Sequence, residues 1–373
     1  MSAETVEIKY GLAGVVVDET SISKVMQEIN SLTYRGYPVQ ELAQRCSFEE
    51  VAWLLWSSEL PSLRELEDFS ARERIQRDVS QNLISQLQKF PDTAHPMDTV
   101  RTAVSLLALE DAETGDNSLD ASRRKAMRLY ARLPTVVAAL FRQRKGLPRI
   151  APRVDLSYSE NFFHMCFGAV PKPEVVKCFE QSMVLYAEHS FNASTFTGRV
   201  VMSTESDIYS AVTAAIGALK GALHGGANEA VMHAMLEIGK VENVVPWLED
   251  ALANKRKIMG FGHRVYRNGD SRVPTMKQAF LRMAEMCGDQ CWAGIYEKLE
   301  AEMLARKNIH PNLDFPAGPA YYLMGFDIDF FTPLFVMSRI TGWTAHFIEQ
   351  QQSNRLIRPL SAYNGPEERH LSI

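Results

Sequence analysis

The spacing of apolar residues predicts a mostly helical chain. From residue 39 onward, apolar side chains recur every three to four positions with polar positions opposite, which is the period of an amphipathic α-helix. Ser47 and Glu50 form a capping-box pattern before one of these segments. The helices predicted from this spacing cover residues 39–46, 48–56, 96–109, 121–141 and 174–188.

The amino-terminal region has a different pattern. Short extended pieces are predicted at residues 7–10, 14–18 and 32–34, and they are separated by Gly11, Gly14 and a turn at 35–38. They predict a small β element ahead of the helices.

A second change of pattern begins at Gly221. Glycines follow at 225, 226, 260, 262 and 269, then a charged helical stretch at 275–307 and a proline-containing loop at 311–319. A strongly apolar helix is predicted at 333–350. Because the chain then returns to core-like sequence, we expect two domains: a large helical domain of residues 1–220 and 325–373, and a small helical domain of residues 221–324. Ligand sites commonly lie between such domains.

Composition narrows the class of protein. The 373 residues are 46% hydrophobic and 23% charged, and 40 basic against 45 acidic residues give a net charge of −5. That balance provides no general electrostatic surface for nucleic acid or an anionic membrane. The amino terminus is acidic without an apolar signal-like run, and no stretch reaches the roughly 18 apolar residues of a spanning helix. We therefore expect a cytoplasmic protein with no nucleic-acid or membrane partner.

The cysteines and histidines show no metal-binding spacing. Five scattered cysteines favour reduced, buried thiols over a disulfide framework. Cys287 and Cys291 are four apart and are expected on one helix face, but two thiols without further ligands make a poor zinc site. We expect no metal.

His224 lies in a glycine-rich turn, Leu-His-Gly-Gly-Ala-Asn-Glu, just before a segment with helical spacing. The positive end of the helix dipole disfavours an imidazolium ion there, so a neutral imidazole can donate a hydrogen bond to a developing oxyanion. The competing interpretation is that His224 has no catalytic function and simply lies near a helix cap.

His263 follows Gly260-Phe-Gly and is surrounded in sequence by basic residues. The two glycines leave backbone N–H groups accessible beside these cations, which favours binding of a phosphate or carboxylate. For Lys255 and Arg256 a solvated surface is the preferred interpretation. The other basic neighbours are Lys257, Arg264, Arg267 and Arg272.

Asp314 stands between apolar neighbours in Asn-Leu-Asp-Phe-Pro-Ala-Gly, a loop stiffened by Pro316. Desolvation raises the pKa of such a carboxylate, as suits a base that removes a weakly acidic C–H proton. The alternative is the N-cap of a helix that begins near Pro319. Arg339 and Arg358 have apolar surroundings, so each needs an internal carboxylate or a substrate carboxylate as partner.

Six motifs occur in one order: His-Ser-Phe-Asn-Ala-Ser from His189, Leu-His-Gly-Gly-Ala-Asn-Glu, Gly-Phe-Gly-His-Arg-Val-Tyr, Asn-Leu-Asp-Phe-Pro-Ala-Gly, Ser-Arg-Ile-Thr-Gly-Trp and Ile-Arg-Pro. With them, essentially the whole chain resembles the citrate synthase family. Within that family, three stretches look most similar to 2-methylcitrate synthases, which condense propionyl-CoA with oxaloacetate: Tyr186-Ala-Glu-His189, Asn192-Ala-Ser-Thr-Phe196 and Asp314-Phe-Pro-Ala-Gly-Pro-Ala-Tyr-Tyr322.

The resemblance implies a mostly helical homodimer with no tightly bound cofactor and a coenzyme A thioester as co-substrate. It implies that Asp314 abstracts the α-proton of the acyl-CoA, that His224 stabilises the enolate, and that His263 polarises and protonates the ketone of oxaloacetate. The residues it implies as oxaloacetate contacts are His189, Arg272, Arg339 and Arg358, the last from the neighbouring subunit. Those it implies as coenzyme A contacts are Lys257, Ile258, Met259, Gly260 and Phe261.

Acyl specificity is the least determined property. Propionyl and acetyl groups differ by one methylene, worth about 1–3 kcal/mol in an apolar pocket, so activity with both thioesters is expected. Tyr186, Leu313 and Phe315 flank the catalytic candidates and are expected to shape that pocket. The alternatives are a citrate synthase that prefers acetyl-CoA and a catalytically silent homologue. The chain lacks the longer amino-terminal β extension of hexameric, NADH-regulated members, so we expect a dimer without that regulation.

Overall fold

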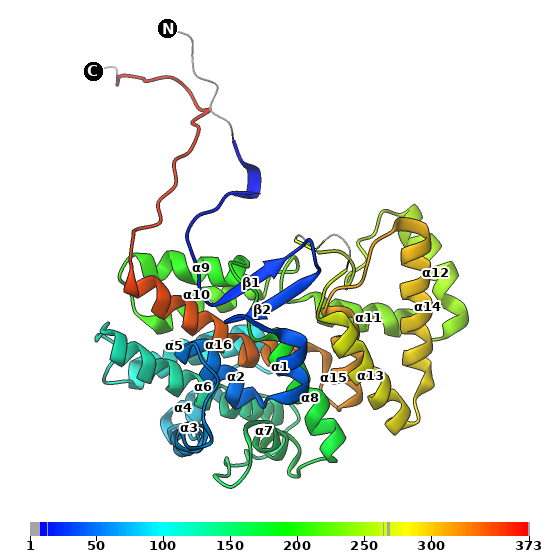
Figure 1. Cartoon of the computed structure of the whole chain (residues 1–373), viewed down its shortest axis with the longest axis horizontal. Helices are drawn as coiled ribbons and strands as arrows, with labels where there is room; N and C mark the ends of the chain where they lie inside the picture. Colours follow the sequence, from blue (N-terminus) through cyan, green and yellow to red (C-terminus); the bar gives the residue numbers. More distant parts are fainter. Residues whose placement is uncertain (1–7, 13, 264, 267–268, 372–373) are drawn as a thin grey trace.

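The computed structural model describes residues 8–12, 14–263, 265–266 and 269–371. These residues form a mostly helical body with one small sheet (Figure 1), which confirms the predicted fold class. The α-helices are α1 (Val39–Arg45), α2 (Phe48–Ser57), α3 (Leu63–Ile75), α4 (Gln81–Leu87), α5 (Pro96–Glu110), α6 (Leu119–Arg144), α7 (Tyr158–Phe167), α8 (Pro173–Tyr186), α9 (Ala193–Ser203), α10 (Ile208–Leu219), α11 (Ala227–Ile238), α12 (Val244–Ala253), α13 (Val273–Cys287), α14 (Gln290–Lys307), α15 (Asp314–Leu323) and α16 (Phe331–Gln352). Short 3-10 turns occur at η1 (Tyr10–Leu12), η2 (Val241–Asn243) and η3 (Ile328–Phe330).

The sheet is antiparallel and consists of β1 (Ser23–Met26), β2 (Ser31–Tyr34) and β3 (Tyr37–Pro38). Ser23 pairs with Tyr34, and β2 and β3 pack against α1. The predicted piece at 32–34 lies in β2. The predicted strands at 8–10 and 14–18 are wrong for the described residues, because neither has a partner strand. Glu7 lies outside the described residues.

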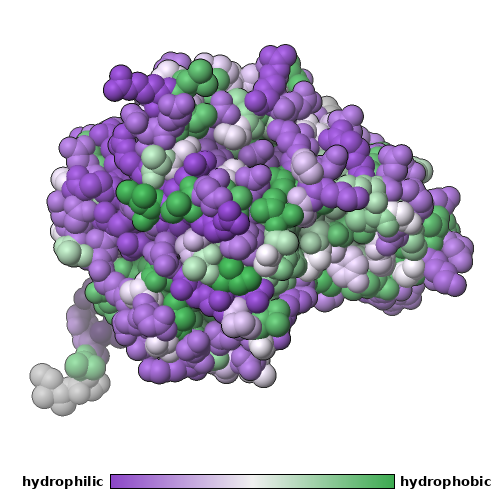
Figure 2. Space-filling view, turned by 90° about the horizontal axis from the view of Figure 1, so that it is seen from below, coloured by the Kyte–Doolittle hydropathy of each residue, from purple (hydrophilic) through white to green (hydrophobic). Residues whose placement is uncertain are grey.

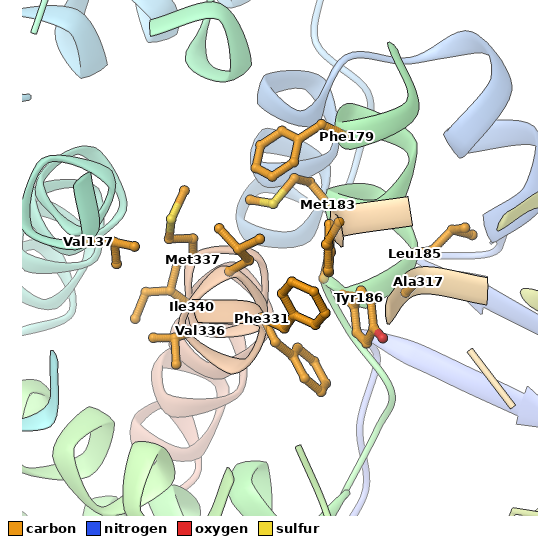
Figure 3. Close-up of a cluster of buried hydrophobic side chains, with 14 of the residues drawn as sticks. Val137, Phe179, Met183, Leu185, Tyr186, Ala317, Phe331, Val336, Met337 and Ile340 are labelled. Carbon is orange, nitrogen blue, oxygen red and sulfur yellow. The ribbon is translucent and has the colours of Figure 1, made fainter. Parts of the chain in front are cut away.

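Helix α16 forms the centre of the hydrophobic core. Nearly all of its residues up to Gln350 are buried, and it packs against α2, α6, α8, α9 and α10. Figure 3 shows Phe331, Met337 and Ile340 of this helix facing Met183 of α8 and Val137 of α6. A helix that is apolar on all sides is stable only when it is surrounded, so the predicted helix at 333–350 is confirmed.

Helices α11 to α15 project from one end of the body (Figure 1). Within this lobe α12 packs against α14, and α15 packs against α11 and α13. Contacts of α13 and α15 with α8, and of α11 with α16, join the lobe to the body. Asp314, the first residue of α15, lies near this junction.

Three local predictions are corrected. The stretch 275–307 is two helices, because Gly288 adopts a left-handed conformation (φ 68°) after α13. Cys287 therefore ends one helix and is exposed, while Cys291 lies in the next. The helix predicted at 174–188 ends at Tyr186, so Glu188 and His189 belong to the connection between α8 and α9.

The surface view in Figure 2 shows hydrophobic residues interspersed among hydrophilic ones over that face. Across the described ranges, no helix is long and apolar enough to cross a membrane. Over the same part of the chain, no group of three or more His, Cys, Asp or Glu side chains is arranged to hold a metal ion.

Two extended arms leave the body, one before β1 and one after α16 (Figure 1). They carry apolar side chains that the chain itself leaves exposed: Ile8, Tyr10, Leu12, Val16, Leu356, Leu360, Tyr363 and Leu371. Such side chains on extended backbone are suited to packing against another molecule.

Candidate active site

Asp314 and Tyr186 meet at the centre of the candidate site. The Tyr186 hydroxyl, at the end of α8, donates a hydrogen bond of 2.6 Å to Asp314 Oδ1 at the start of α15. The carbonyl of Tyr186 in turn accepts from Arg339 Nε at 2.7 Å. Residues separated by more than a hundred positions are thus held together by two direct hydrogen bonds.

The electrostatic environment raises the basicity of the Asp314 carboxylate. Burial raises the pKa of its carboxyl group to about 6, and the hydrogen bond from Tyr186 partly offsets that rise. Asp314 is the first residue of α15, and its N–H donates to Asn312 Oδ1 at 3.1 Å. The loop expected around Asp314 and the helix start near Pro319 are therefore corrected, because the helix begins at Asp314 itself.

His224 lies just before α11, as predicted. The N–H of Ser194 points at its Nε2 at 3.3 Å, which assigns Nε2 as the acceptor and leaves the ring proton on Nδ1. Ser194 Oγ is 2.8 Å from the same nitrogen and accepts from Trp343 Nε1 at 3.0 Å. Burial, followed by the charge of Arg339, lowers the pKa of His224 to about 3. The ring is consequently a neutral hydrogen-bond donor at physiological pH.

His263 has the opposite tautomer. Its Nδ1 accepts from the N–H groups of Val265 at 3.0 Å and Tyr266 at 3.2 Å, so the ring proton resides on Nε2. Burial and then the charge of Arg272 lower the pKa of His263 to about 4. The His189 ring lies 5.0 Å from that of His263, measured between centroids.

Arg339 is the clearest sign of an anionic ligand. Its side chain is 1% exposed, and burial lowers the pKa of its guanidinium to about 10. Among the described residues, no carboxylate forms an ion pair with it, and its Nη1 has no hydrogen-bond partner. The charge of Glu188 acts on Arg339 without direct contact and partly offsets the effect of burial. A buried cation with no carboxylate in ion-pair contact is still costly, so this arrangement favours a ligand that supplies a carboxylate. His189 Nε2 is likewise buried without a partner in that part of the chain.

Arg272 has an internal partner instead. Its Nε and Nη2 lie 2.9 Å and 2.7 Å from the two oxygens of Asp270. Asp270 Oδ2 also accepts from the N–H of Leu313 at 3.2 Å. Asp270 therefore links Arg272 to the residues that carry Asp314.

The segment 257–261 is joined to the Asp314 turn through backbone. The N–H of Asn312 donates to the carbonyl of Gly260 at 2.8 Å, and the rings of Phe261 and Phe315 lie 4.4 Å apart. Gly260 has φ 84°, and a Cβ there would lie 2.5 Å from a methyl group of Val231. Lys257 is exposed, Ile258, Met259 and Phe261 are half-buried, and Gly260 is buried. The predicted coenzyme A segment and the predicted base thus form one local unit.

One predicted site residue is not brought to the site. Arg358 is exposed on the carboxy-terminal arm, and its side chain donates only to the adjacent Pro359 carbonyl at 3.4 Å. The expectation that it has buried, apolar surroundings is wrong within one chain. Arg264 and Arg267, expected among the cations near His263, lie outside the described residues. Arg256, expected on a solvated surface, is exposed and paired with Glu237 and Asp250.

The acyl-pocket candidates divide into two groups. Tyr186 and Leu313 are buried next to Asp314, whereas Phe315 packs against Phe261 and stacks on Tyr296 at 4.3 Å.

Phe335 was missed by the sequence analysis. Its ring lies 4.2 Å from that of Tyr186 and 6.3 Å from that of His224, and the Arg339 guanidinium lies 4.7 Å from it. Its position four residues before Arg339 on an apolar helix is the signal that could have identified it.

A helical fold with a buried carboxylate of raised pKa, two neutral histidines and a buried arginine without an ion-pair partner suits a condensing enzyme that acts on a carboxylate substrate. Residues 11–360 match the family model described as citrate synthase, C-terminal domain. The chain belongs to the citrate synthase family, which confirms the resemblance and the class of condensing acyltransferase.

Relatives of this chain align with it over essentially its full length. It is 64% identical over 375 aligned residues to a 2-methylcitrate synthase of Mycobacterium tuberculosis, covering 100% of this chain and 95% of that protein. It is 62% identical over 369 residues to a citrate synthase of Mycolicibacterium smegmatis, covering 99% and 98%. The structure matches a citrate synthase from Thermoplasma acidophilum that was solved as a ternary complex with carboxymethyl coenzyme A and oxaloacetate. The TM-score is 0.92, the sequence identity is 32%, and the match covers 98% of both chains.

Proposed function

We propose that this protein is a 2-methylcitrate synthase, which condenses propionyl-CoA with oxaloacetate and water to give 2-methylcitrate and CoA, with some activity on acetyl-CoA. The 64% identity to a 2-methylcitrate synthase supports this choice. The observation that carries it is the grouping of a carboxylate whose pKa is about 6 with the buried guanidinium of Arg339, which has no ion-pair partner among the described residues. The first is a base for a C–H acid, and the second is a receptor for a carboxylate.

In the first step Asp314 removes a proton from the α-carbon of propionyl-CoA. The electron pair moves onto the thioester oxygen, where His224 donates a hydrogen bond from Nδ1. Because the pKa of His224 is only about 3, the ring stays neutral and stabilises the enolate as a donor.

In the second step the enolate carbon attacks the ketone carbon of oxaloacetate. His263 Nε2–H gives its proton to the ketone oxygen as the new carbon–carbon bond forms. His189, Arg272 and Arg339 hold the carboxylates of oxaloacetate. Water then hydrolyses the thioester and releases the CoA thiol. The proton that Asp314 took from the α-carbon replaces the one that His263 gave up, so both side chains return to their starting states.

Domain closure and coenzyme A binding belong to the same proposal. Residues 221–324 form a small domain that closes on the large domain of residues 1–220 and 325–373, which excludes water from the enolate. Coenzyme A binds along Lys257, Ile258, Met259, Gly260 and Phe261, and the backbone hydrogen bond from Asn312 to Gly260 supports this placement beside the base. Tyr186, Leu313 and Phe315 shape the acyl pocket.

The working enzyme is a homodimer in which Arg358 of one subunit completes the site of the other. Support comes from the exposed position of Arg358 and from the exposed apolar side chains on the same arm. A second chain would bury these side chains and could bring the guanidinium to a site that binds a substrate with two carboxylates.

A second candidate is a citrate synthase that prefers acetyl-CoA, favoured by the 62% identity to a citrate synthase. Initial rates of thiol release with oxaloacetate, measured for propionyl-CoA and acetyl-CoA on one preparation, separate the two. We expect a higher kcat/KM for propionyl-CoA. A higher value for acetyl-CoA would favour the second candidate, and no thiol release with either would indicate a silent homologue.

A further inference from the structure

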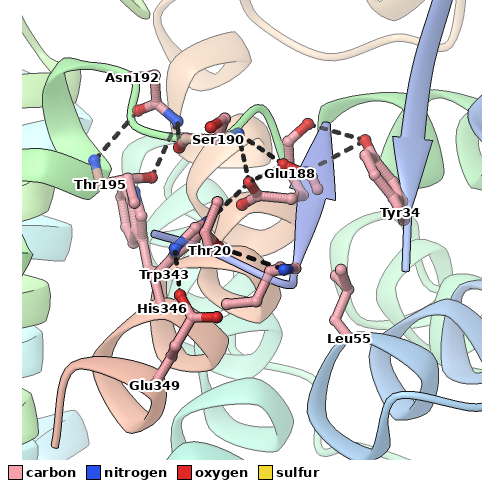
Figure 4. A network of polar contacts seen from close by, with 12 residues as sticks. Thr20, Tyr34, Leu55, Glu188, Ser190, Asn192, Thr195, Trp343, His346 and Glu349 are labelled. Atoms are coloured by element: carbon pink, nitrogen blue, oxygen red, sulfur yellow. Dashed lines mark hydrogen bonds and ion pairs between the residues drawn. The ribbon is translucent and has the colours of Figure 1, made fainter. Parts of the chain in front are cut away.

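A buried charge pair lies behind the loop that carries His189. Glu188 and His346 have side chains that are fully buried, and Glu188 Oε1 lies 2.8 Å from His346 Nε2 (Figure 4). Removing two charges from water is costly, and a replacement by apolar side chains would often be at least as stable. A gain in stability alone is therefore a poor explanation for the presence of this pair.

Glu188 is held by two strands and by its own loop. Its side chain accepts from Ser23 Oγ of β1 at 2.8 Å, and its N–H donates to the Tyr34 hydroxyl of β2 at 3.2 Å. Tyr34 donates back to the Glu188 carbonyl at 2.9 Å. The N–H of Ser190 donates to both Glu188 Oε1 and Ser23 Oγ. His189 thus has a fixed residue on each side.

The network continues beyond His346. Its Nδ1 lies 3.7 Å from Glu349 Oε2, which also pairs with Arg199 Nη1 at 3.0 Å. Arg199 Nη2 lies 2.8 Å from Asp18 and its Nη1 lies 3.4 Å from His346 Nδ1. Although burial acts against an imidazolium, Glu188 and Glu349 raise the pKa of His346, which favours a charged ring. Charges thus alternate in sign from the loop to the amino-terminal arm.

A small shift of the loop that carries His189 would move its ring within the candidate site. His189 is 7% exposed, and its ring faces His263 at 5.0 Å and Tyr266 at 5.6 Å. Its Nε2 has no partner among the described residues, so its orientation depends on the backbone that carries it.

We propose that Glu188 and His346 form a positioning pair for His189. The small sheet and α16 hold this loop through them, so that the pair sets oxaloacetate binding and leaves acyl-CoA binding unchanged. This inference rests on the proposed function, since it assigns His189 to the oxaloacetate side of the site.

The test compares Glu188→Gln, His346→Gln and the double variant in steady-state kinetics. Gln keeps an acceptor oxygen at position 188 but removes the charge. We expect each single variant to raise the KM for oxaloacetate by about tenfold, with the KM for propionyl-CoA within about twofold of wild type. Because the two residues act as one unit, the KM for oxaloacetate of the double variant should be no higher than that of the more impaired single variant.

Glu73→Gln is the matched control. Glu73 and Arg77 also form a buried pair, with side chains 1% exposed and an N–O distance of 2.7 Å, but in and just after α3. Its loss should lower Tm without changing either KM. The same result for Glu188→Gln and His346→Gln would overturn the inference, as would equal changes in both KM values.

Two additions keep the test decisive. In a His189→Ala background, Glu188→Gln should have little further effect on the KM for oxaloacetate, and an undiminished effect would contradict a role through His189. If Glu188→Gln does not fold, His346→Gln alone decides through the same two KM values. Absence of thiol release by the wild-type enzyme would refute the proposed function instead.

Discussion

Asp314 shows how a single residue acquires its chemistry from its surroundings. The sequence predicted a raised pKa from the apolar neighbours, and the structure bears this out with a pKa of about 6 caused mainly by burial. The hydrogen bond from Tyr186 was not predictable, because the two residues are 128 positions apart and meet only when α8 and α15 pack. Sequence neighbours thus indicated the direction of the shift, while tertiary contacts set its size.

The pKa of Asp314 leads to a pH prediction. The base acts only when ionised, so kcat/KM for propionyl-CoA should fall as pH decreases through about 6. Initial rates of thiol release between pH 5 and 8 would measure this acid limb. A profile that stays flat down to pH 5 would contradict the assignment of Asp314 as the base.

The substitution Tyr186→Phe should move the acid limb of the pH profile of kcat/KM to higher pH. The hydroxyl stabilises the carboxylate, so its removal raises the pKa of Asp314 and lowers the ionised fraction at a given pH. Tyr321→Phe is the matched control, since the Tyr321 hydroxyl is also buried but donates to Ser182 Oγ at 3.0 Å. We expect the limb of the control to coincide with that of wild type. An unshifted or lowered limb in Tyr186→Phe would rule out this role for the hydroxyl.

At the scale of elements, α16 combines core and site. Arg339 and Phe335 face the candidate site from a helix that otherwise fills the core. The apolar sequence predicted the helix but not which of its turns faces that site. The break between α13 and α14 was missed although Gly288 is a typical helix-ending residue, because the charged pattern continues across it. Periodicity identified helices well where one face is buried and located their ends less well.

Gly342→Ala tests how tightly α16 packs on the Glu188 loop. A Cβ at Gly342 would lie 2.3 Å from Glu188 Oε2 and 2.4 Å from the Ala187 carbonyl oxygen, so the loop or the helix must move. We expect a loss of about 1–3 kcal/mol in the free energy of unfolding, measured by chemical denaturation. Gly217→Ala on α10 is the control, because a Cβ there meets no described atom within 4 Å. Equal stability of the two variants would contradict this account of the packing.

At the scale of the whole molecule, Arg358 tests the proposed dimer. Arg358→Ala and Asp314→Asn should each abolish most activity, since one lacks a carboxylate contact and the other lacks the base. When the two variants are unfolded and refolded together, a mixed dimer has one complete site if Arg358 acts across the interface. Random mixing should then restore about a quarter of wild-type activity. No recovery in demonstrably mixed dimers would show that Arg358 acts within its own chain.

The sequence by itself determined the helical class and the family, and it supplied the candidates for the proton-handling residues. The helical class follows from local periodicity and the family resemblance from short motifs with glycine and proline turns, all of which depend on neighbouring residues. Only the tertiary structure decided that Tyr186 donates a hydrogen bond to Asp314, that Arg339 is buried with no ion-pair partner among the described residues, and that the small sheet anchors the His189 loop through Glu188. Such properties depend on distances between segments far apart in the chain, which periodicity and local motifs do not encode.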